Sequence, residues 1–446
     1  MLNNISGFPE FLPRDQIAFN RTVEIIRRQF ELYGFTPLDT PVVERISTLL
    51  AKGNDSEIYG IHRLADVDGA EKKDLALRFD LTVPLARYVA QHYGNLTFPY
   101  RRYHIAPVWR GERPQAGRYR QFYQCDIDII GDGALSLIHD AEVLSVIYNV
   151  FRAIGLTRFI IKINNRYILT GLIKAFGISE GNISPIMRTI DKAEKITSDI
   201  LQSELISQGL SMSDAGVIVD ITSRQMSNAE WIRYLKALCT NEEFVTGISE
   251  LQEVLHNTQA FGIPNSFLQI APALARGLNY YTGTVSETRL LDYLELGSVC
   301  GGGRYANLAG TFSSKQLPGV GFSIGISRLI PKLIEAGIIK AEAETPARVL
   351  ITTQNPDFML QYIQMAKILR DSDINTELYL ARKSLGAQMK YANKKGVDFA
   401  IIADKAEFDA GQIILRYMAS GAQSTATIED AINIIRNALY QGAVVR

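Results

Sequence analysis

One pair of long segments, joined by a short polar loop, constrains the fold of this chain more than any other feature. The segments YRRYHIAPVWR (residues 100–110) and RYRQFYQCDIDIIG (residues 118–131) flank the loop GERPQAG. Strand-forming residues on both sides of a Gly- and Pro-containing loop are typical of a β-hairpin, and antiparallel strands need only a short connection. We therefore expect a long antiparallel hairpin from Tyr100 to Gly131.

Polar and apolar residues alternate along the second segment of this hairpin. Side chains of a strand point to opposite faces in turn, so each face collects every second residue. One face carries Phe122, Gln124, Asp126 and Asp128, and the other carries Tyr123, Cys125, Ile127 and Ile129. An amide and two carboxylates in a row cost free energy unless the face is wet or binds a ligand. The sequence leaves both interpretations open, a solvated outer face and a ligand site.

Arginines gather around the hairpin loop: Arg110, Arg113, Arg118 and Arg120. Arginine offers planar, bidentate donors that match phosphate groups. Such clusters are also common on protein surfaces, but here the loop adjoins a strand that carries carboxylates. The combination predicts that one hairpin holds a polyphosphate and an amino compound side by side.

Three shorter patterns each have two interpretations. In LRFDLTVP, Asp80 and Thr82 either receive an ammonium group from one strand face or form a turn at a strand end. The run CGGGRY, which ends at Tyr305, either allows close backbone approach to a ligand and positive φ, or forms a bulge. In GVGFSIGISRLI, Arg328 is either a site residue early in a helix or an ordinary surface arginine.

The rest of the chain divides into regions of different periodicity. Residues 16–33 have the apolar spacing of an amphipathic helix, and FTPLDTPVVE has the prolines of an edge strand. Residues 166–261 are helix-rich and polar, and the chain from residue 346 onward alternates strands and helices, as a compact α/β module does. At 446 residues the chain is too long for one hydrophobic core, so we expect several domains.

Composition narrows the class of protein only slightly. Lys plus Arg and Asp plus Glu number 47 each, so any contact with nucleic acid must come from local patches. The three cysteines lack metal-ligand or redox spacing, which indicates a reducing compartment. We see neither a signal-peptide pattern nor an apolar run long enough to cross a membrane, and so expect a cytoplasmic protein without membrane contact.

These patterns stand in the order found in histidyl-tRNA synthetases, which the chain resembles over nearly its whole length. The segment around Pro41 resembles motif 1 of class II aminoacyl-tRNA synthetases, the hairpin resembles motif 2, and residues 319–329 resemble motif 3. The runs LARGLNYY and CGGGRY resemble two signatures special to the histidine enzymes. The conjunction of five matches is far more specific than any one of them.

The resemblance implies an α+β fold with a class II antiparallel-sheet catalytic core, a helical insertion and a C-terminal α/β anticodon-binding domain. It places the catalytic core at residues 1–165 and 266–336, the insertion at 166–265 and the anticodon-binding domain at 337–446. The implied activity is ATP-dependent ligation of L-histidine to tRNA(His) through a histidyl-adenylate. ATP is then a substrate, Mg²⁺ a cofactor and a homodimer the working form.

The resemblance also assigns roles by position. The catalytic arginines at the α-phosphate of ATP are Arg110 and Arg276. The other residues near ATP are Glu112, Arg118 and Arg328. The α-amino group of histidine is bound by Asp80 and Thr82 with Gln124 nearby, and the imidazole pocket is lined by Asp128, Tyr281 and Tyr305. The residues near the tRNA acceptor end are Arg113 and Gln115, and metal ligands are unknown. The C-terminal module has a basic patch of Arg382, Lys383, Lys390, Lys394 and Lys395, which a solvated helix face explains equally well.

Three positions depart from the family pattern. Asn279 and Ala306 stand where aspartate is usual, and Ser327 stands where glutamate is common. An alternative function is a paralogue of the same fold that regulates ATP phosphoribosyltransferase and does not charge tRNA. A non-catalytic RNA-binding protein on the same scaffold is a further alternative. Both are expected to lose the phosphate-binding arginines, which this sequence keeps.

Overall fold

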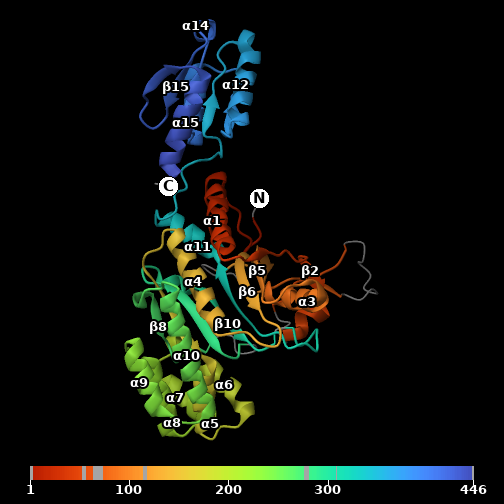
Figure 1. Cartoon of the computed structure of the whole chain (residues 1–446), viewed down its shortest axis with the longest axis vertical. Coiled ribbons are helices and arrows are strands. Elements are labelled where there is room, and N and C mark those ends of the chain that lie inside the picture. Colours follow the sequence, from red (N-terminus) through yellow and green to blue (C-terminus); the bar gives the residue numbers. More distant parts are fainter. Residues whose placement is uncertain are drawn as a thin grey trace. The chain divides into compact units, whose positions relative to one another are not determined.

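The computed structural model describes residues 4–52, 57–63, 74–113, 118–275, 281–307 and 309–443. The chain divides into two compact units. The first unit comprises residues 1–9 and 22–332, and the second comprises residues 10–21 and 333–446. Each unit combines a sheet with helices, and the large sheet lies in the first (Figure 1).

An eight-stranded sheet forms the centre of the first unit, in the order β1-β5-β6-β11-β10-β9-β7-β8. Its strands are β1 (Thr36–Pro37), β5 (Tyr100–Trp109), β6 (Gln121–Ile130), β7 (Phe159–Asn165), β8 (Leu268–Ile270), β9 (Thr284–Leu290), β10 (Ser298–Tyr305) and β11 (Gly319–Gly325). The outer pairs β1–β5 and β7–β8 are parallel, and the inner pairs are antiparallel. This is the antiparallel core of the predicted α+β fold.

The predicted hairpin is present as β5 and β6. The two strands pair from Tyr100 opposite Ile130 to Trp109 opposite Gln121. On the apolar face of β6, Cys125, Ile127 and Ile129 are buried and Tyr123 is partly buried, and helix α4 (Ile138–Ala153) contacts both β6 and β11. The Pro-punctuated segment is confirmed as an edge strand, β1, and the amphipathic helix is confirmed as α1 (Pro13–Leu32).

A small three-stranded sheet, in the order β2-β4-β3, completes the strands of the first unit. Its strands are β2 (Val43–Arg45), β3 (Gly60–Ile61) and β4 (Leu75–Leu77). Helix α2 (Ile46–Leu49) follows β2, and α3 (Thr82–His92) follows β4 after a short turn. The buried residues Leu49, Ala76 and Val83 pack together and fix the start of α3 against this sheet.

The helix-rich region is confirmed as a group of helices between β7 and β8. They are α5 (Arg166–Ala175), α6 (Glu180–Ile190), α7 (Ser198–Ser207), α8 (Met212–Ser223), α9 (Asn228–Leu238) and α10 (Glu242–Ala260). Figure 1 shows them gathered at one end of the first unit. Buried residues such as Ile186, Leu201, Leu205 and Ile218 give the group a core of its own.

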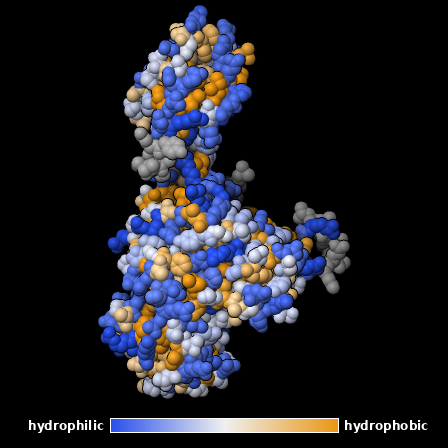
Figure 2. Space-filling model, in the orientation of Figure 1, coloured by the Kyte–Doolittle hydropathy of each residue, from blue (hydrophilic) through white to orange (hydrophobic). Residues whose placement is uncertain are grey.

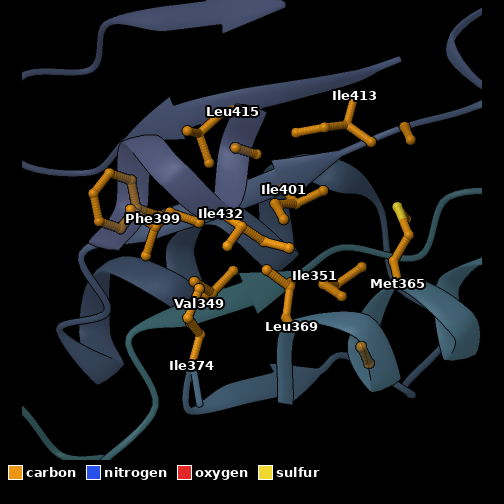
Figure 3. Close-up of a cluster of buried hydrophobic side chains, with 14 of the residues drawn as sticks. Val349, Ile351, Met365, Leu369, Ile374, Phe399, Ile401, Ile413, Leu415 and Ile432 are labelled. Carbon is orange, nitrogen blue, oxygen red and sulfur yellow. The ribbon is translucent and has the colours of Figure 1, made fainter. Parts of the chain in front are cut away.

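The second unit contains a five-stranded sheet in the order β13-β12-β14-β15-β16. Its strands are β12 (Val349–Ile351), β13 (Thr376–Leu378), β14 (Phe399–Ile402), β15 (Ile413–Tyr417) and β16 (Gln423–Ala426). Its helices are α12 (Met359–Asp371), α13 (Leu385–Lys395), α14 (Lys405–Asp409) and α15 (Ile428–Ala443). Aliphatic and aromatic side chains from strands and helices meet in its core (Figure 3). The predicted α/β module is thus present.

The surface carries both polar and apolar residues. Figure 2 shows hydrophilic and hydrophobic residues interspersed over the visible face of the described chain. Among the helices that the structure describes, none is both long and apolar enough to cross a lipid bilayer.

Candidate active site

A cavity of about 280 Å³ lies in the first unit, lined by residues of β6, β10 and β11 and by residues at the start of α3. Residues singled out from the sequence line it: Asp80, Thr82, Arg110, Gln124, Asp128, Tyr281, Tyr305 and Arg328. They come from segments that are far apart in the sequence. The fold therefore brings the predicted amino-acid and phosphate residues into one space.

The polar face of β6 forms one wall of this cavity. Gln124, Asp126 and Asp128 all line it, and they are only 9%, 3% and 4% exposed. The interpretation as a solvated outer face is therefore wrong. Because buried polar groups without partners cost free energy, the face has the character of a ligand site.

Asp128 is held from two sides. The side chain of Arg102 on β5 is completely buried, and its Nη2 lies 2.5 Å from Asp128 Oδ2. The Tyr305 hydroxyl donates a hydrogen bond of 3.0 Å to Asp128 Oδ1. Burial, followed by the charge of Asp128, raises the pKa of Tyr305 well above its usual value, so the hydroxyl keeps the proton that it donates. These contacts fix the position of the carboxylate.

Glycines on β11 leave the space that this arrangement needs. A Cβ on Gly321 would lie 1.9 Å from Asp128 Oδ1, and a Cβ on Gly319 would lie 2.4 Å from the Tyr305 ring. No side chain fits at such distances. The floor of the cavity below Asp128 is therefore made of backbone.

The glycine run on β10 serves the same close packing. A Cβ on Gly302 would lie 2.1 Å from the carbonyl oxygen of Gly321, and a Cβ on Gly303 would lie 2.4 Å from the carbonyl oxygen of Thr284. The register shift of β10 falls earlier, between Ser298 and Cys300. The glycines are thus neither the bulge itself nor residues of positive φ, and they permit neighbouring backbones to approach.

Asp80 and Thr82 do not share a strand face, so that part of the prediction is wrong. Strand β4 ends at Leu77 and α3 begins at Thr82. Asp80 Oδ1 accepts a 3.0 Å hydrogen bond from the Val83 N–H, which satisfies a free donor of the first helical turn. The turn alternative is correct, and both side chains nevertheless line the cavity.

Asp126 lines the cavity as well, although the resemblance assigned it no role. Gln124 Nε2 donates a 2.8 Å hydrogen bond to Ser323 Oγ, and Ser323 also hydrogen-bonds the Asp126 carboxyl. The remaining oxygens, Gln124 Oε1 and Asp126 Oδ1, have no hydrogen-bond partner within the described residues. The alternation along β6 had placed Asp126 on this face, but it could not show the contact with Ser323.

Arginines mark a second part of the cavity. Arg110 Cζ lies 5.0 Å from the centroid of the Phe122 ring, and its Nε donates a 3.1 Å hydrogen bond to the Phe79 carbonyl. Arg328 lies in the first turn of α11 (Ile326–Glu335) and donates to the Ser298 carbonyl. The interpretation of Arg328 as an ordinary surface residue is therefore wrong. Both side chains line the same cavity as the carboxylates.

The remaining predicted residues lie beyond this cavity. Arg118 lines an adjoining cleft of about 590 Å³, which also includes Arg328. Arg118 Nη1 lies 3.2 Å from Glu112 Oε2, and Arg113 is exposed on the same loop. Among the described residues that line the first cavity, Arg118, Glu112 and Arg113 are not found. Arg276 and Gln115 lie outside the described residues, so their roles stay predictions.

The three departures from the family pattern have different surroundings. Ser327 is buried, and its Oγ accepts a 2.7 Å hydrogen bond from the Tyr123 N–H, which ties the start of α11 to β6. Ala306 is exposed at the end of β10. Asn279 lies outside the described residues.

Burial sets the protonation of two groups beside the cavity. It raises the pKa of Asp126 to about 7. It also lowers the pKa of His104 to about 3, with the charges of Arg102 and Arg78 acting in the same direction. His104 is therefore neutral at physiological pH, and Asp126 is close to its titration midpoint.

Comparisons with known proteins match nearly the whole chain. The family model for histidyl-tRNA synthetase matches residues 7–329, and the model for the anticodon-binding domain matches residues 348–438. The histidine–tRNA ligase of Clostridium tetani is 43% identical over 435 residues, which cover 97% of this chain and 98% of the relative. The crystal structure of histidyl-tRNA synthetase from Nostoc sp. PCC 7120 is 39% identical with a TM-score of 0.90, covering 98% of this chain and 99% of that one.

A solved structure from Bacillus halodurans, titled an ATP phosphoribosyltransferase regulatory subunit/histidyl-tRNA synthetase, is 21% identical with a TM-score of 0.72. It covers 88% of this chain and 96% of that one, and shows the fold alone. The fold and the cavity are those of a class II aminoacyl-tRNA synthetase. The chain belongs to the histidyl-tRNA synthetase family.

Proposed function

We propose that this chain catalyses the ATP-dependent ligation of L-histidine to tRNA(His) through a histidyl-adenylate intermediate. The observation that carries the proposal is that acidic and basic side chains line the same cavity. Carboxylates and an amide line β6, and Arg110 and Arg328 line the same space. An amino acid and a nucleotide bound there would lie side by side, as the reaction between them requires.

The reaction has two steps. The histidine carboxylate attacks the α-phosphorus of ATP, forming histidyl-adenylate and releasing pyrophosphate. A terminal ribose hydroxyl of the tRNA then attacks the carbonyl carbon, forming the ester and releasing AMP. Negative charge develops on phosphate oxygens in the first step, so fixed arginines stabilise the transition state and no protein nucleophile is needed.

The phosphate residues are proposed from position and from the geometry of the cavity. Arg110 holds the α-phosphate, and its contacts with Phe79 and Phe122 orient the guanidinium before ATP arrives. Arg328 contacts the outer phosphates. Arg276 acts at the α-phosphate with Arg110, as the family pattern implies. The residues proposed near ATP and the tRNA end at the hairpin loop are Glu112, Arg118, Arg113 and Gln115.

The histidine residues are proposed in the same way. Asp80, Thr82 and Gln124 receive the α-amino group, and Asp128, Tyr281 and Tyr305 line the imidazole pocket. An imidazole presents a donor and an acceptor on opposite ring nitrogens, and a site built for such a group rejects apolar side chains of similar size strongly. Asp128, which Arg102 and Tyr305 hold in place, is suited to accept the ring N–H.

The metal, the assembly and the location belong to the same proposal. Mg²⁺ arrives with the phosphates of ATP, because Mg²⁺ keeps most of its ligands from water and substrate. Among the residues that the structure describes, no three acidic, histidine or cysteine side chains are placed to bind a metal ion together. A cytoplasmic homodimer is the form that the resemblance implies. The domain limits 1–165, 166–265, 266–336 and 337–446 are proposed with it.

Histidine-dependent exchange of labelled pyrophosphate into ATP tests the activity. Purified protein is expected to incorporate labelled pyrophosphate into ATP when histidine is present and not when any other amino acid replaces it. It is also expected to charge tRNA(His). A regulatory subunit would show neither reaction. Folded protein without exchange at saturating histidine would contradict the proposal.

A further inference from the structure

Asp126 is a buried carboxylate that the proposed reaction does not use. It lines the cavity, is 3% exposed, and its Oδ1 has no hydrogen-bond partner within the described residues. Gln124, two positions earlier on the same strand face, is also buried, and its Oε1 likewise has no hydrogen-bond partner within the described residues. Buried acceptors are nearly always bonded in folded proteins, so two neighbouring free acceptors indicate a ligand that donates.

The charged groups packed around Asp126 are mostly negative. On β5, Arg102 makes its ion pair with Asp128 and its charge also lowers the pKa of Asp126, whereas the register partner of Asp126, His104, is neutral. Asp128 on β6 and Asp80 before α3 both add negative charge near it. This part of the cavity therefore favours a cation.

The hydroxyl of Ser323 on β11 links the two residues that carry the free oxygens. It binds both Gln124 and Asp126, so the two free oxygens belong to one hydrogen-bonded cluster. An ammonium group carries three donors and a positive charge, enough to serve both oxygens. The imidazole side of the cavity is already ordered around Asp128 by Arg102 and Tyr305.

We propose that Asp126 accepts a hydrogen bond from the α-ammonium group of histidine, beside Gln124 Oε1, and is a specificity-determining residue of the activation step. The proposal rests on the proposed function and adds a residue to it. In the empty site burial keeps the pKa of Asp126 near 7, and a bound ammonium group favours the ionised form. Histidine binding is thereby coupled to the loss of a proton from Asp126.

The test compares wild type with Asp126→Asn, which removes the charge and keeps the shape. In histidine-dependent pyrophosphate exchange at pH 8, the KM for histidine is expected to rise about 10- to 100-fold, the range of a hydrogen bond to a charged group. The KM for ATP is expected to stay the same. Asp132→Asn, at an exposed aspartate two residues after the end of β6, is the matched control and should change neither constant.

The pH profile adds a result that a merely structural role would not give. The ratio of the two KM values, variant over wild type, is expected to fall by up to about tenfold from pH 8 to pH 6, because a carboxyl of pKa 7 is only about one-tenth ionised at pH 6. The titration of histidine itself affects both proteins equally. Imidazolepropionic acid lacks the α-amino group, and its inhibition constant is expected to be the same for both.

The outcomes separate the two proposals. An unchanged KM for histidine in the variant, with active wild type, would overturn the role of Asp126 and leave the proposed function intact. An equal loss of affinity for imidazolepropionic acid would also overturn it, because the contact would then be to the ring. Wild type that neither exchanges pyrophosphate nor binds histidine in calorimetry would overturn both. If the asparagine variant does not fold, Asp126→Ser is measured in the same way.

Discussion

The two large sheets of this chain differ in the polar side chains that they bury. In the five-stranded sheet of the second unit, the strands contribute apolar residues to one core: Val349, Ile351, Phe399, Ile401, Ile413 and Leu415 (Figure 3). In the eight-stranded sheet, the hairpin buries polar and charged residues: Arg102, His104, Gln124, Asp126 and Asp128. Secondary structure of the same kind thus serves stability in one sheet and binding in the other.

The difference has a physical cause. Burying an aliphatic side chain stabilises the fold by roughly 1.5 to 3 kcal/mol, whereas burying an unpaired polar group destabilises it by a similar amount. Burial of the apolar face of β6 therefore stabilises the strand, whereas the polar residues of the cavity wall do not.

Replacing Arg110 with alanine has the largest expected effect. Removal of a fixed donor at a developing charge costs about 100- to 1,000-fold in rate, so single-turnover formation of histidyl-adenylate should slow by that factor. Thermal unfolding should change little, because the Arg110 side chain makes one hydrogen bond to the Phe79 carbonyl and one contact with the Phe122 ring within the described residues. The exposed Arg152 of α4 supplies the control, Arg152→Ala. An unchanged rate would remove Arg110 from the phosphate site.

Ile401→Ala should lower stability and leave the reaction rate unchanged. Ile401 is fully buried on β14, and truncation of such a residue destabilises a core by about 2 to 5 kcal/mol. The unfolding midpoint of the second unit should fall. Below that midpoint, the rate of histidine-dependent pyrophosphate exchange should stay at the wild-type level. A parallel loss of exchange rate would mean that the two sheets do not divide stability and binding.

The pH dependence of the free energy of unfolding should show how much the buried Asp126 carboxylate destabilises the fold. The folded pKa of Asp126, about 7, lies above the ordinary aspartate value of 3.8, so the folded state holds a proton that the unfolded state has lost. That contribution to stability is present at low pH and is lost as the pH rises through 7. Between pH 5.5 and 7.5, wild type should lose about 2 kcal/mol more than Asp126→Asn. Urea unfolding at both pH values measures it, and equal losses would contradict the burial argument.

The basic patch of the second unit has the smallest expected effect. Lys390 and Lys394 are exposed on α13, one turn apart. If they contact tRNA phosphates, replacing both with alanine should weaken tRNA binding several-fold and reduce the slope of log affinity against log salt by about 1 to 2. The control is Lys367→Ala on α12, whose ammonium is paired with Asp371. An unchanged slope would favour the solvated-face interpretation of the patch.

The parts of the fold that could be predicted from the sequence are those with a local signal. The hairpin, the amphipathic helix α1 and the helical region each depend on a repeat within one segment. The face of β6 followed from its alternation alone, and it proved to be the wall of the cavity. The grouping of Asp80, Gln124 and Arg328 came only from the resemblance, because no local pattern relates segments so far apart.

The missed features depend on partners that are distant in sequence. Gln124 and Ser323 are separated by 199 residues, and their contact follows from the pairing of β6 with β11. The state of Asp126 follows from the same pairing and from burial, neither of which the alternation can show. Asp80 was misplaced because a period of two over three residues does not distinguish a strand from the turn before a helix.

The backbone floor under Asp128 limits how the amino-acid pocket can be redesigned. An engineer who wishes to accept a smaller amino acid would normally fill the pocket with a larger side chain. At Gly319 and Gly321 of β11 that route is closed, because neither position has room even for a methyl group. New specificity must therefore be introduced from the walls, where Tyr281 and Gln124 offer side chains that can be exchanged.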